Sequence, residues 1–216
     1  MEVIRIARQI HGLRSPALSP YLNNLGRFYK DTRRYAKSEK MLRRSLAIER
    51  KLNPTGSNVA DRINNLGHLY AIRKQFDKAK AMFLEALQIM ETYYETGHFF
   101  TGTVCGNLGA TYLQLGQLGK ARKMLNRAVE ISYGYWGAGN PVTAIYLANL
   151  GKVHQAWKHF AKAETLYLKA LGNINGPFGD LHAKTLMVVT LLRDLYAEWG
   201  KQEKATHYAQ WLAGAE

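Results

Sequence analysis

The feature that most constrains the fold of this chain is a unit of 41 to 42 residues that recurs along the sequence. An asparagine returns at this interval, followed by Leu-Gly and, three residues after the glycine, by a tyrosine or histidine. The aligned asparagines are Asn24, Asn65, Asn107 and Asn149. Self-similarity at a fixed period of this length is typical of an array in which one supersecondary unit is repeated.

A second block follows the first at a constant distance in each copy, as in "YAKSEKML" from Tyr35 and "FAKAETLY" from Phe160. A fifth copy keeps the apolar positions but has Leu191 in place of the asparagine and Arg193 in place of the glycine. Residues ahead of the first copy have the pattern of a second helix, so the chain is expected to begin in the middle of a repeat. We predict one domain, 1–216, made of a partial repeat at 1–12, full repeats at 19–58, 59–100, 101–142 and 143–184, and a degenerate capping repeat at 185–216.

Each copy predicts two helices joined by a short turn. In the second copy Ile63, Leu66 and Tyr70 have the i, i+3, i+7 spacing of one apolar helical stripe. Gly67 lies beside this stripe, where the missing side chain allows another helix to approach closely. Because a single hairpin cannot bury its own stripe, neighbouring hairpins must stack, and the sequence predicts an all-α solenoid.

The Leu-Gly pair, the tyrosine after it and the small residue in the second helix resemble the tetratricopeptide repeat family, over essentially the whole chain. The longer period and the link "INGPFGDLHAKTL" are similar to the 42-residue repeats of kinesin light chains, although the links "NPTGSNVAD" and "ETGHFFTGT" depart from that pattern. The resemblance implies a right-handed superhelix with the first helices on its concave side. It also implies a non-catalytic protein–protein interaction module.

The repeated asparagine has two interpretations. An amide both donates and accepts hydrogen bonds, so a row of them can hold the backbone of an extended peptide, as related superhelical repeats do. Alternatively, each amide ties one repeat to the next. The doubled asparagines of the first two copies favour that end for the tightest contact. The predicted peptide-binding residues are Asn23, Asn24, Arg27, Lys30, Asn64, Asn65, His68, Asn107, Asn149 and Lys152.

The charge of the chain indicates an acidic partner. The formal net charge is +14, and residues 1–58 hold 13 Lys and Arg against 4 Asp and Glu. Cations near both ends of the predicted groove and the apolar Ala110 and Leu113 between them favour an acidic linear peptide with a bulky apolar anchor. The alternative is that these charges are only a solvated surface. A second basic group, predicted as an anion-binding ridge or a solvated outer face, consists of Lys37, Lys40, Arg43 and Arg44.

Two other functions compete with peptide binding. A self-associating scaffold, or a regulatory segment of a larger multidomain protein, is plausible because the ends of a repeat array are apolar, and exposed ends would permit a homo-oligomer. Nucleic-acid binding through the basic first repeat is disfavoured, because stacking aromatic residues are not interleaved with the cations.

No catalytic residue, metal site or cofactor is predicted. The stretch "GQLGKA" imitates a phosphate-binding loop, but Gln114 stands where the first glycine is required and Ala121 where Ser or Thr is required, so it is assigned to a hairpin turn. His154 and His159 are five residues apart and are expected on different faces of a helix, which fits no common metal-ligand spacing.

The single cysteine, Cys105, occupies an apolar helix position and is expected to be a buried thiol. No long apolar run predicts a membrane-spanning helix. The arginine-rich residues 1–14 have some character of a transit peptide but match the repeat pattern, which favours an ordinary helix and a cytoplasmic location.

Overall fold

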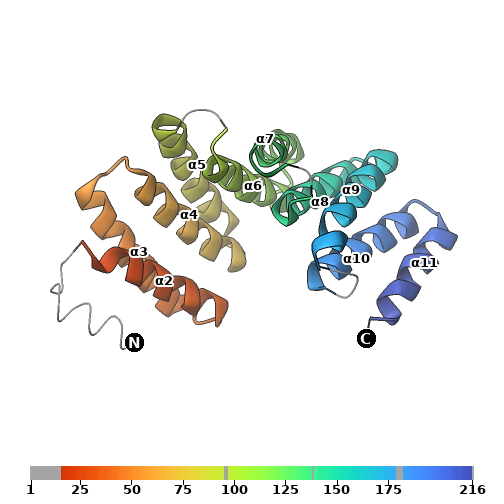
Figure 1. The fold of residues 1–216 in the computed structure, drawn as a ribbon, viewed down its shortest axis with the longest axis horizontal. Helices are drawn as coiled ribbons and strands as arrows, with labels where there is room; N and C mark the ends of the chain where they lie inside the picture. The colour runs from red at the N-terminus through yellow and green to blue at the C-terminus, as the bar shows by residue number, and fades with distance from the viewer. Residues whose placement is uncertain (1–15, 95–96, 138, 179–181, 216) are drawn as a thin grey trace. The chain divides into compact units, whose positions relative to one another are not determined.

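A computed structural model describes residues 16–94, 97–137, 139–178 and 182–215. Every regular element in these residues is an α-helix, as Figure 1 shows. The chain forms two compact units that divide after Thr96, and each is described by itself. The helix predicted at residues 1–12 lies outside the described residues. The all-α prediction is confirmed.

The first unit holds two helical hairpins, and each helix packs against the next one in the chain (Figure 1). The first helices of the two hairpins also lie beside each other, so they form one layer of the unit. The two hairpins span residues 18–52 and 57–93. Their helices are α2 (Leu18–Asp31) and α3 (Tyr35–Leu52), then α4 (Ser57–Ile72) and α5 (Phe76–Tyr93).

The second unit holds three further hairpins with the same arrangement, in which α6 lies beside α8 and α8 beside α10. The last hairpin corresponds to the copy that lacks the asparagine and the glycine. The helices of this unit are α6 (Phe99–Gln114), α7 (Leu118–Trp136), α8 (Pro141–Ala156), α9 (Phe160–Phe178), α10 (Ala183–Glu198) and α11 (Gln202–Ala213).

In the four copies that have the repeat glycine, the two helices of the hairpin approach each other closely at this residue. A Cβ atom built on Gly67 would lie 2.6 Å from the ring of Phe83, and one built on Gly151 would lie 2.4 Å from the ring of Tyr167. Both distances are shorter than van der Waals contact, so only glycine allows the large side chain of the second helix to pack here. The close approach predicted at Gly67 is confirmed.

The turn inside each hairpin has one residue in the left-handed conformation, again at a 41- or 42-residue interval. This residue is Gly116 in the third hairpin, with φ of 70°, and Lys74 in the second, with φ of 57°. The next backbone N–H donates to the carbonyl of the repeat tyrosine, as from Gln117 to Tyr112 over 2.9 Å, which closes the end of the first helix. The "GQLGKA" stretch therefore begins in the predicted hairpin turn and continues into the first turn of α7.

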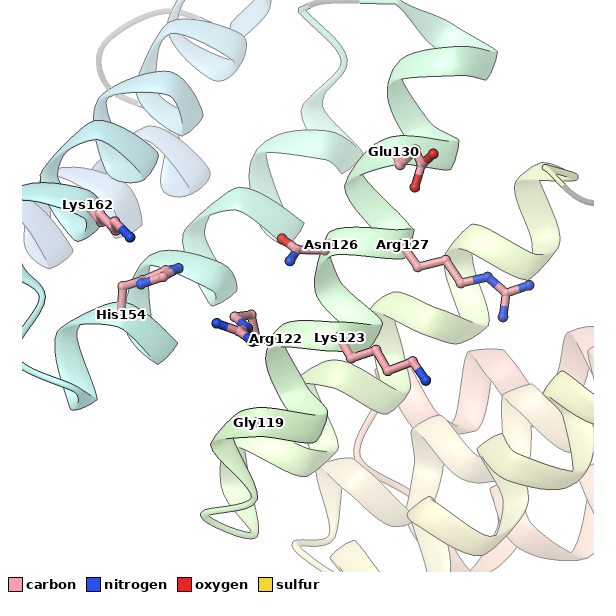
Figure 2. A pocket seen from close by; sticks show the side chains of 8 residues that line it. All are labelled: Gly119, Arg122, Lys123, Asn126, Arg127, Glu130, His154 and Lys162. Carbon is pink, nitrogen blue, oxygen red and sulfur yellow. The ribbon is translucent and has the colours of Figure 1, made fainter.

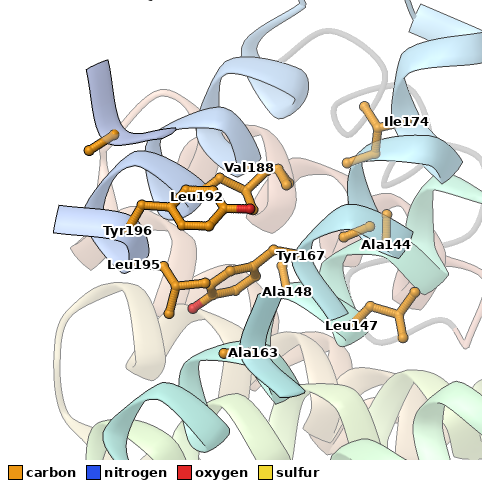
Figure 3. Close-up of a cluster of buried hydrophobic side chains, with 12 residues drawn as sticks. Ala144, Leu147, Ala148, Ala163, Tyr167, Ile174, Val188, Leu192, Leu195 and Tyr196 are labelled. Atoms are coloured by element: carbon orange, nitrogen blue, oxygen red, sulfur yellow. The ribbon is translucent and has the colours of Figure 1, made fainter. Parts of the chain in front are cut away.

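The cores consist of the apolar stripes that the repeat pattern identified. Figure 3 shows the cluster between α8, α9 and α10, where Tyr167 and Tyr196 lie among small and branched side chains. Tyr29, Tyr70 and Tyr112 are also buried, as is Cys105. Removal of these side chains from water supplies most of the free energy that holds the hairpins together.

Candidate functional site

The first helices carry the predicted peptide-binding residues, and we call their shared surface in each unit the first-helix face. In the first unit this face is formed by α2 and α4. Asn24 and Arg27 are exposed on it, whereas Asn23 is only 4% exposed. The doubled asparagines of this unit therefore differ in environment, and Asn24 is the more accessible of the first pair.

Asn23 and Asn65 tie the first two repeats together. The Asn65 amide nitrogen donates to the Asn23 amide oxygen over 3.0 Å and to an Asp61 carboxylate oxygen over 3.4 Å. The alternative interpretation of the asparagines, a bond between neighbouring repeats, is thus realised at this position. Among the described residues, none donates a hydrogen bond to the Asn65 amide oxygen.

The Asn65 hydrogen bond to Asp61 connects the two asparagines to a buried ionic network that the sequence pattern did not reveal. Asp61 pairs with Arg62, and the Arg62 guanidinium lies 3.4 Å from the carboxylate of Glu49. Ser19 on α2 donates its hydroxyl to the same Glu49 carboxylate over 2.5 Å. Charges in a dry interior must be paired, so this network positions α2, α3 and α4 relative to one another.

Lys30 and His68, also predicted ligand-binding residues, contact each other. The Lys30 ammonium lies 3.0 Å from the His68 Nδ1 atom and 3.6 Å from an Asp31 carboxylate oxygen. Partial desolvation of the exposed His68 side chain lowers the pKa of its imidazole, and the charges of Lys30 and Arg27 lower it further, while Asp31 opposes them. The ring is therefore neutral at pH 7 and accepts the hydrogen bond from Lys30.

In the second unit Asn107 on α6 and Asn149 on α8 are half-buried on the first-helix face. Lys152, one turn after Asn149, is also half-buried, and burial lowers the pKa of its ammonium group. No acidic residue among those described in this unit forms an ion pair with Lys152. The face thus presents amides and an ammonium group that lacks a counter-ion.

The four residues of the predicted basic ridge on α3 do not share one environment. Lys37 and Lys40 are exposed, and Arg44 is half-buried. Arg43 instead donates to the Glu39 carboxylate over 3.0 Å and to the Tyr70 hydroxyl over 2.6 Å. Arg43 therefore belongs to the contact between the first and second repeats.

The contact between Tyr70 and Glu39 recurs later in the chain. In both places the hydroxyl of the repeat tyrosine donates to a glutamate on the second helix of the preceding hairpin. We call the contact between successive hairpins at these two positions the repeat junction. Tyr70 donates to Glu39 over 2.9 Å, and Tyr196 donates to Glu164 over 2.6 Å. Cations surround both glutamates; Arg73 lies 2.8 Å from Glu39. Burial by itself would raise the pKa of Glu39, but the hydrogen bonds from Tyr70 and Arg43 and the nearby arginine charges lower it overall.

The junction between the third and fourth repeats has a different composition. Arg122 occupies the position of the glutamate, and His154 occupies that of the tyrosine. Figure 2 shows Arg122 and Asn126 on α7 facing His154 on α8 and Lys162 on α9, whereas Lys123 and Arg127 extend from the other side of α7. An open depression of about 860 Å³ lies here, lined by Gly119, Arg122, Lys123, Asn126, Arg127, Glu130, His154 and Lys162.

The two histidines near this depression correct one expectation. α8 ends at Ala156, so His159 lies in the turn and not on a further helical face. The turn brings the His154 and His159 rings to 6.0 Å between centroids. The described residues hold no group of three or more His, Cys, Asp or Glu side chains that could bind a metal ion.

Comparison with known proteins identifies the fold. Two family models, both described as tetratricopeptide repeat, match residues 59–133 and 21–55, together about half of the chain. No curated protein matches. No described helix combines the length and hydropathy needed to cross a bilayer.

Among solved structures, BtubC (BKLC) from P. vanneervenii superposes with a TM-score of 0.81 at 20% identity, over 99% of this chain and 85% of that one. The putative kinesin light chain repeats of Podosopora anserina give 0.76 at 17% identity, over 93% and 95% of the two chains. The apo form of RapI gives 0.73 at 16% identity, over 99% of this chain but 58% of RapI. These likenesses concern the fold. The family matches, the repeat glycines and the five hairpins of the described residues show that the chain belongs to the tetratricopeptide repeat family.

Proposed function

We propose that the first-helix face binds an extended, acidic segment of a partner protein. Tetratricopeptide repeats in general mediate protein–protein interaction. The observation that carries the proposal is Lys152, a half-buried ammonium group without a carboxylate partner among the described residues of its unit. An acidic side chain would compensate for the burial of this charge, and the pKa of Lys152 would rise on binding.

The amides beside Lys152 fit the backbone of such a segment. Asn107 and Asn149 lie at the same position of successive first helices and are half-buried. An extended backbone presents alternating donors and acceptors, which an amide side chain can pair in either direction. In the first unit, the exposed Asn24 and Arg27 offer the same combination of amide and cation.

A peptide array tests the proposal. Peptides of about ten residues with acidic, neutral and basic sequences around a central apolar residue are probed with the full chain, and the best acidic peptide is titrated by fluorescence anisotropy. We expect Asn149→Ala and Lys152→Gln each to weaken binding about tenfold, since each removes a hydrogen bond, charge-assisted for Lys152, with little change in Tm. Lys169→Gln, which removes an exposed charge from the second helix α9, is the matched control.

Asn65→Ala separates the two roles of the asparagines. It removes the bond to Asn23, so we expect a lower Tm for this variant. If Asn149→Ala and Lys152→Gln bound every peptide as the wild type does, the peptide-binding function of this face would be refuted, and the asparagines would have only their structural role.

A further inference from the structure

The junction between the third and fourth repeats lacks the anion found at the junctions of Tyr70 and Tyr196. In those junctions Glu39 and Glu164 each accept a hydrogen bond from the repeat tyrosine and lie against cations. The equivalent position on α7 holds Arg122, so a negative group is replaced by a positive one. The local charge differs from that of a glutamate junction by two positive charges.

The lysine that neutralises Glu164 in the last junction has a counterpart beside Arg122. Lys204, in the last junction, lies 2.9 Å from the Glu164 carboxylate. Lys162 occupies the same place one repeat earlier, and it faces Arg122 across the depression of Figure 2. Neither Lys162 nor Arg122 forms an ion pair with any described residue of this unit, which leaves both charges without an acidic partner.

His154 adds an unused hydrogen-bonding atom. Its Nδ1 atom is buried and has no hydrogen-bond partner among the described residues, which is rare for a buried polar atom and costly unless a ligand or water satisfies it. Burial lowers the pKa of His154, and the charges of Lys162, His159 and Arg122 lower it further. The negative charge of an anion bound in the depression would instead raise the pKa of His154.

The Arg122 guanidinium is held in place by an aromatic ring. It lies 5.3 Å from the centroid of Trp157, whose ring is 5.7 Å from that of His154. This cation–π contact favours one position of the guanidinium and leaves its N–H groups available to a ligand. Because the guanidinium donors are ordered before a ligand binds, less side-chain conformational entropy is lost on binding.

We propose that Arg122, His154 and Lys162 form a binding site for a phosphoryl group, separate from the first-helix face. A phosphoryl group carries a charge of about −1.5 to −2 at pH 7, which matches the two extra positive charges of this junction more closely than a carboxylate does. Arginine recognises phosphate in a bidentate manner, and the remaining phosphate oxygens are acceptors for the lysine and the histidine. Glu130, which also lines the depression, is exposed and is the one acidic group of the lining.

Calorimetric titration at fixed pH and ionic strength tests this site. The probes are inorganic phosphate, a Gly/Ser-rich peptide with one central phosphoserine, and the same peptide with glutamate or unmodified serine. We expect the phosphoserine peptide to bind at least about tenfold more tightly than the glutamate peptide, because the dianion makes more charge-assisted hydrogen bonds. Tighter binding of the phosphoserine peptide than of inorganic phosphate would indicate that the phosphoryl group belongs to a phosphorylated partner protein. Tighter binding of inorganic phosphate would indicate that it belongs to a small phosphate compound.

Two variants and a control make the test specific to the junction. Arg122→Glu places at this position the glutamate of the other junctions, beside Lys162, so it should lower phosphate affinity at least about tenfold and raise the Tm. Lys162→Gln should weaken binding similarly, and Lys169→Gln on the same helix should change it less than about twofold. Circular dichroism verifies that each variant folds, and Arg122→Gln replaces Arg122→Glu if it does not. Equal binding of the glutamate and phosphoserine peptides, wild-type affinity in both variants, or no binding of any phosphate probe would refute the proposal.

Discussion

At the scale of single residues, the repeat junction shows how one side chain decides the chemistry of an otherwise constant structure. Glu39 and Glu164 neutralise cations and accept a tyrosine hydroxyl, whereas Arg122 at the same position creates an open cationic depression. The helical hairpin is the same in each copy, so the difference arises from the side chains alone.

The Glu39 junction predicts a pH-dependent stability. The pKa of Glu39 is lower in the folded chain than its ordinary value of 4.5, so its stabilising effect is present above this value and is lost as the pH falls through the folded-state pKa. We expect Glu39→Gln to lower the free energy of unfolding by about 1 kcal/mol at pH 7 and to have a smaller effect near pH 3. Urea unfolding at several pH values measures this. An equal loss at pH 7 and pH 3 would contradict the ionic role of Glu39.

The left-handed residue of the hairpin turn predicts opposite changes in stability for two substitutions, one that removes a glycine and one that introduces it. Gly116 has φ of 70° and no atom within 4 Å of an added Cβ, so Gly116→Ala should cost about 1 kcal/mol from backbone conformation alone. Lys74 adopts φ of 57° as a non-glycine residue, so Lys74→Gly should gain about 0.5–1 kcal/mol. Thermal unfolding of both variants measures the difference, and a loss of stability in Lys74→Gly would show that the lysine side chain matters more than its φ angle.

At the scale of helices, the glycine opposite a large residue sets the distance between the two helices of a hairpin. Gly26 faces Leu42, Gly67 faces Phe83, and Gly109 faces Leu125 in the same way. The cost of glycine in a helix, about 1 kcal/mol relative to alanine, is offset by the burial of the large side chain over it. This small-to-large pairing explains why both positions recur together in the sequence.

The pairing predicts opposite effects of one substitution at two glycines of neighbouring helices. Gly151→Ala would place a Cβ atom 2.4 Å from the Tyr167 ring, so the helices must move apart, at a cost of about 2–3 kcal/mol. Gly172, on α9, has no atom within 4 Å of an added Cβ, so Gly172→Ala should stabilise the chain by about 0.5–1 kcal/mol. Chemical denaturation of the two variants is the measurement. Equal effects would mean that helix propensity, and not close packing, governs this position.

At the scale of the whole molecule, the net charge of +14 affects every acidic partner. Long-range attraction accelerates encounter with an acidic peptide, and salt screens it beyond about 8–10 Å at physiological ionic strength. We expect a rise in NaCl from about 50 to 200 mM to slow association severalfold and to change dissociation little. Stopped-flow fluorescence with the acidic peptide from the array measures both rates. A loss of affinity that lies entirely in dissociation would indicate that the contacts are local ion pairs.

The same experiment with single-stranded DNA distinguishes the nucleic-acid hypothesis. An equally tight complex with DNA that weakens steeply with salt would favour a general polyanion-binding surface over a peptide site. We expect the acidic peptide to compete better than DNA at physiological salt, because under the proposed function the amides of Asn107 and Asn149 pair with a peptide backbone.

The amino-acid sequence by itself determined the repeat, its helical hairpins, the glycine contacts, the buried tyrosines and the turn at residues 116–121. These features depend on contacts within one copy or between identical positions of adjacent copies, so a periodic pattern records them. Only the tertiary structure decided which polar side chains meet across copies. It joined Asn65 to Asn23, Lys30 to His68 and Tyr70 to Glu39, and it left Arg122, His154 and Lys162 together without an anion. The hydrogen-bonded pairs lie 31 to 42 residues apart, and a hydrogen bond depends on distances of a few tenths of an ångström that no sequence period specifies.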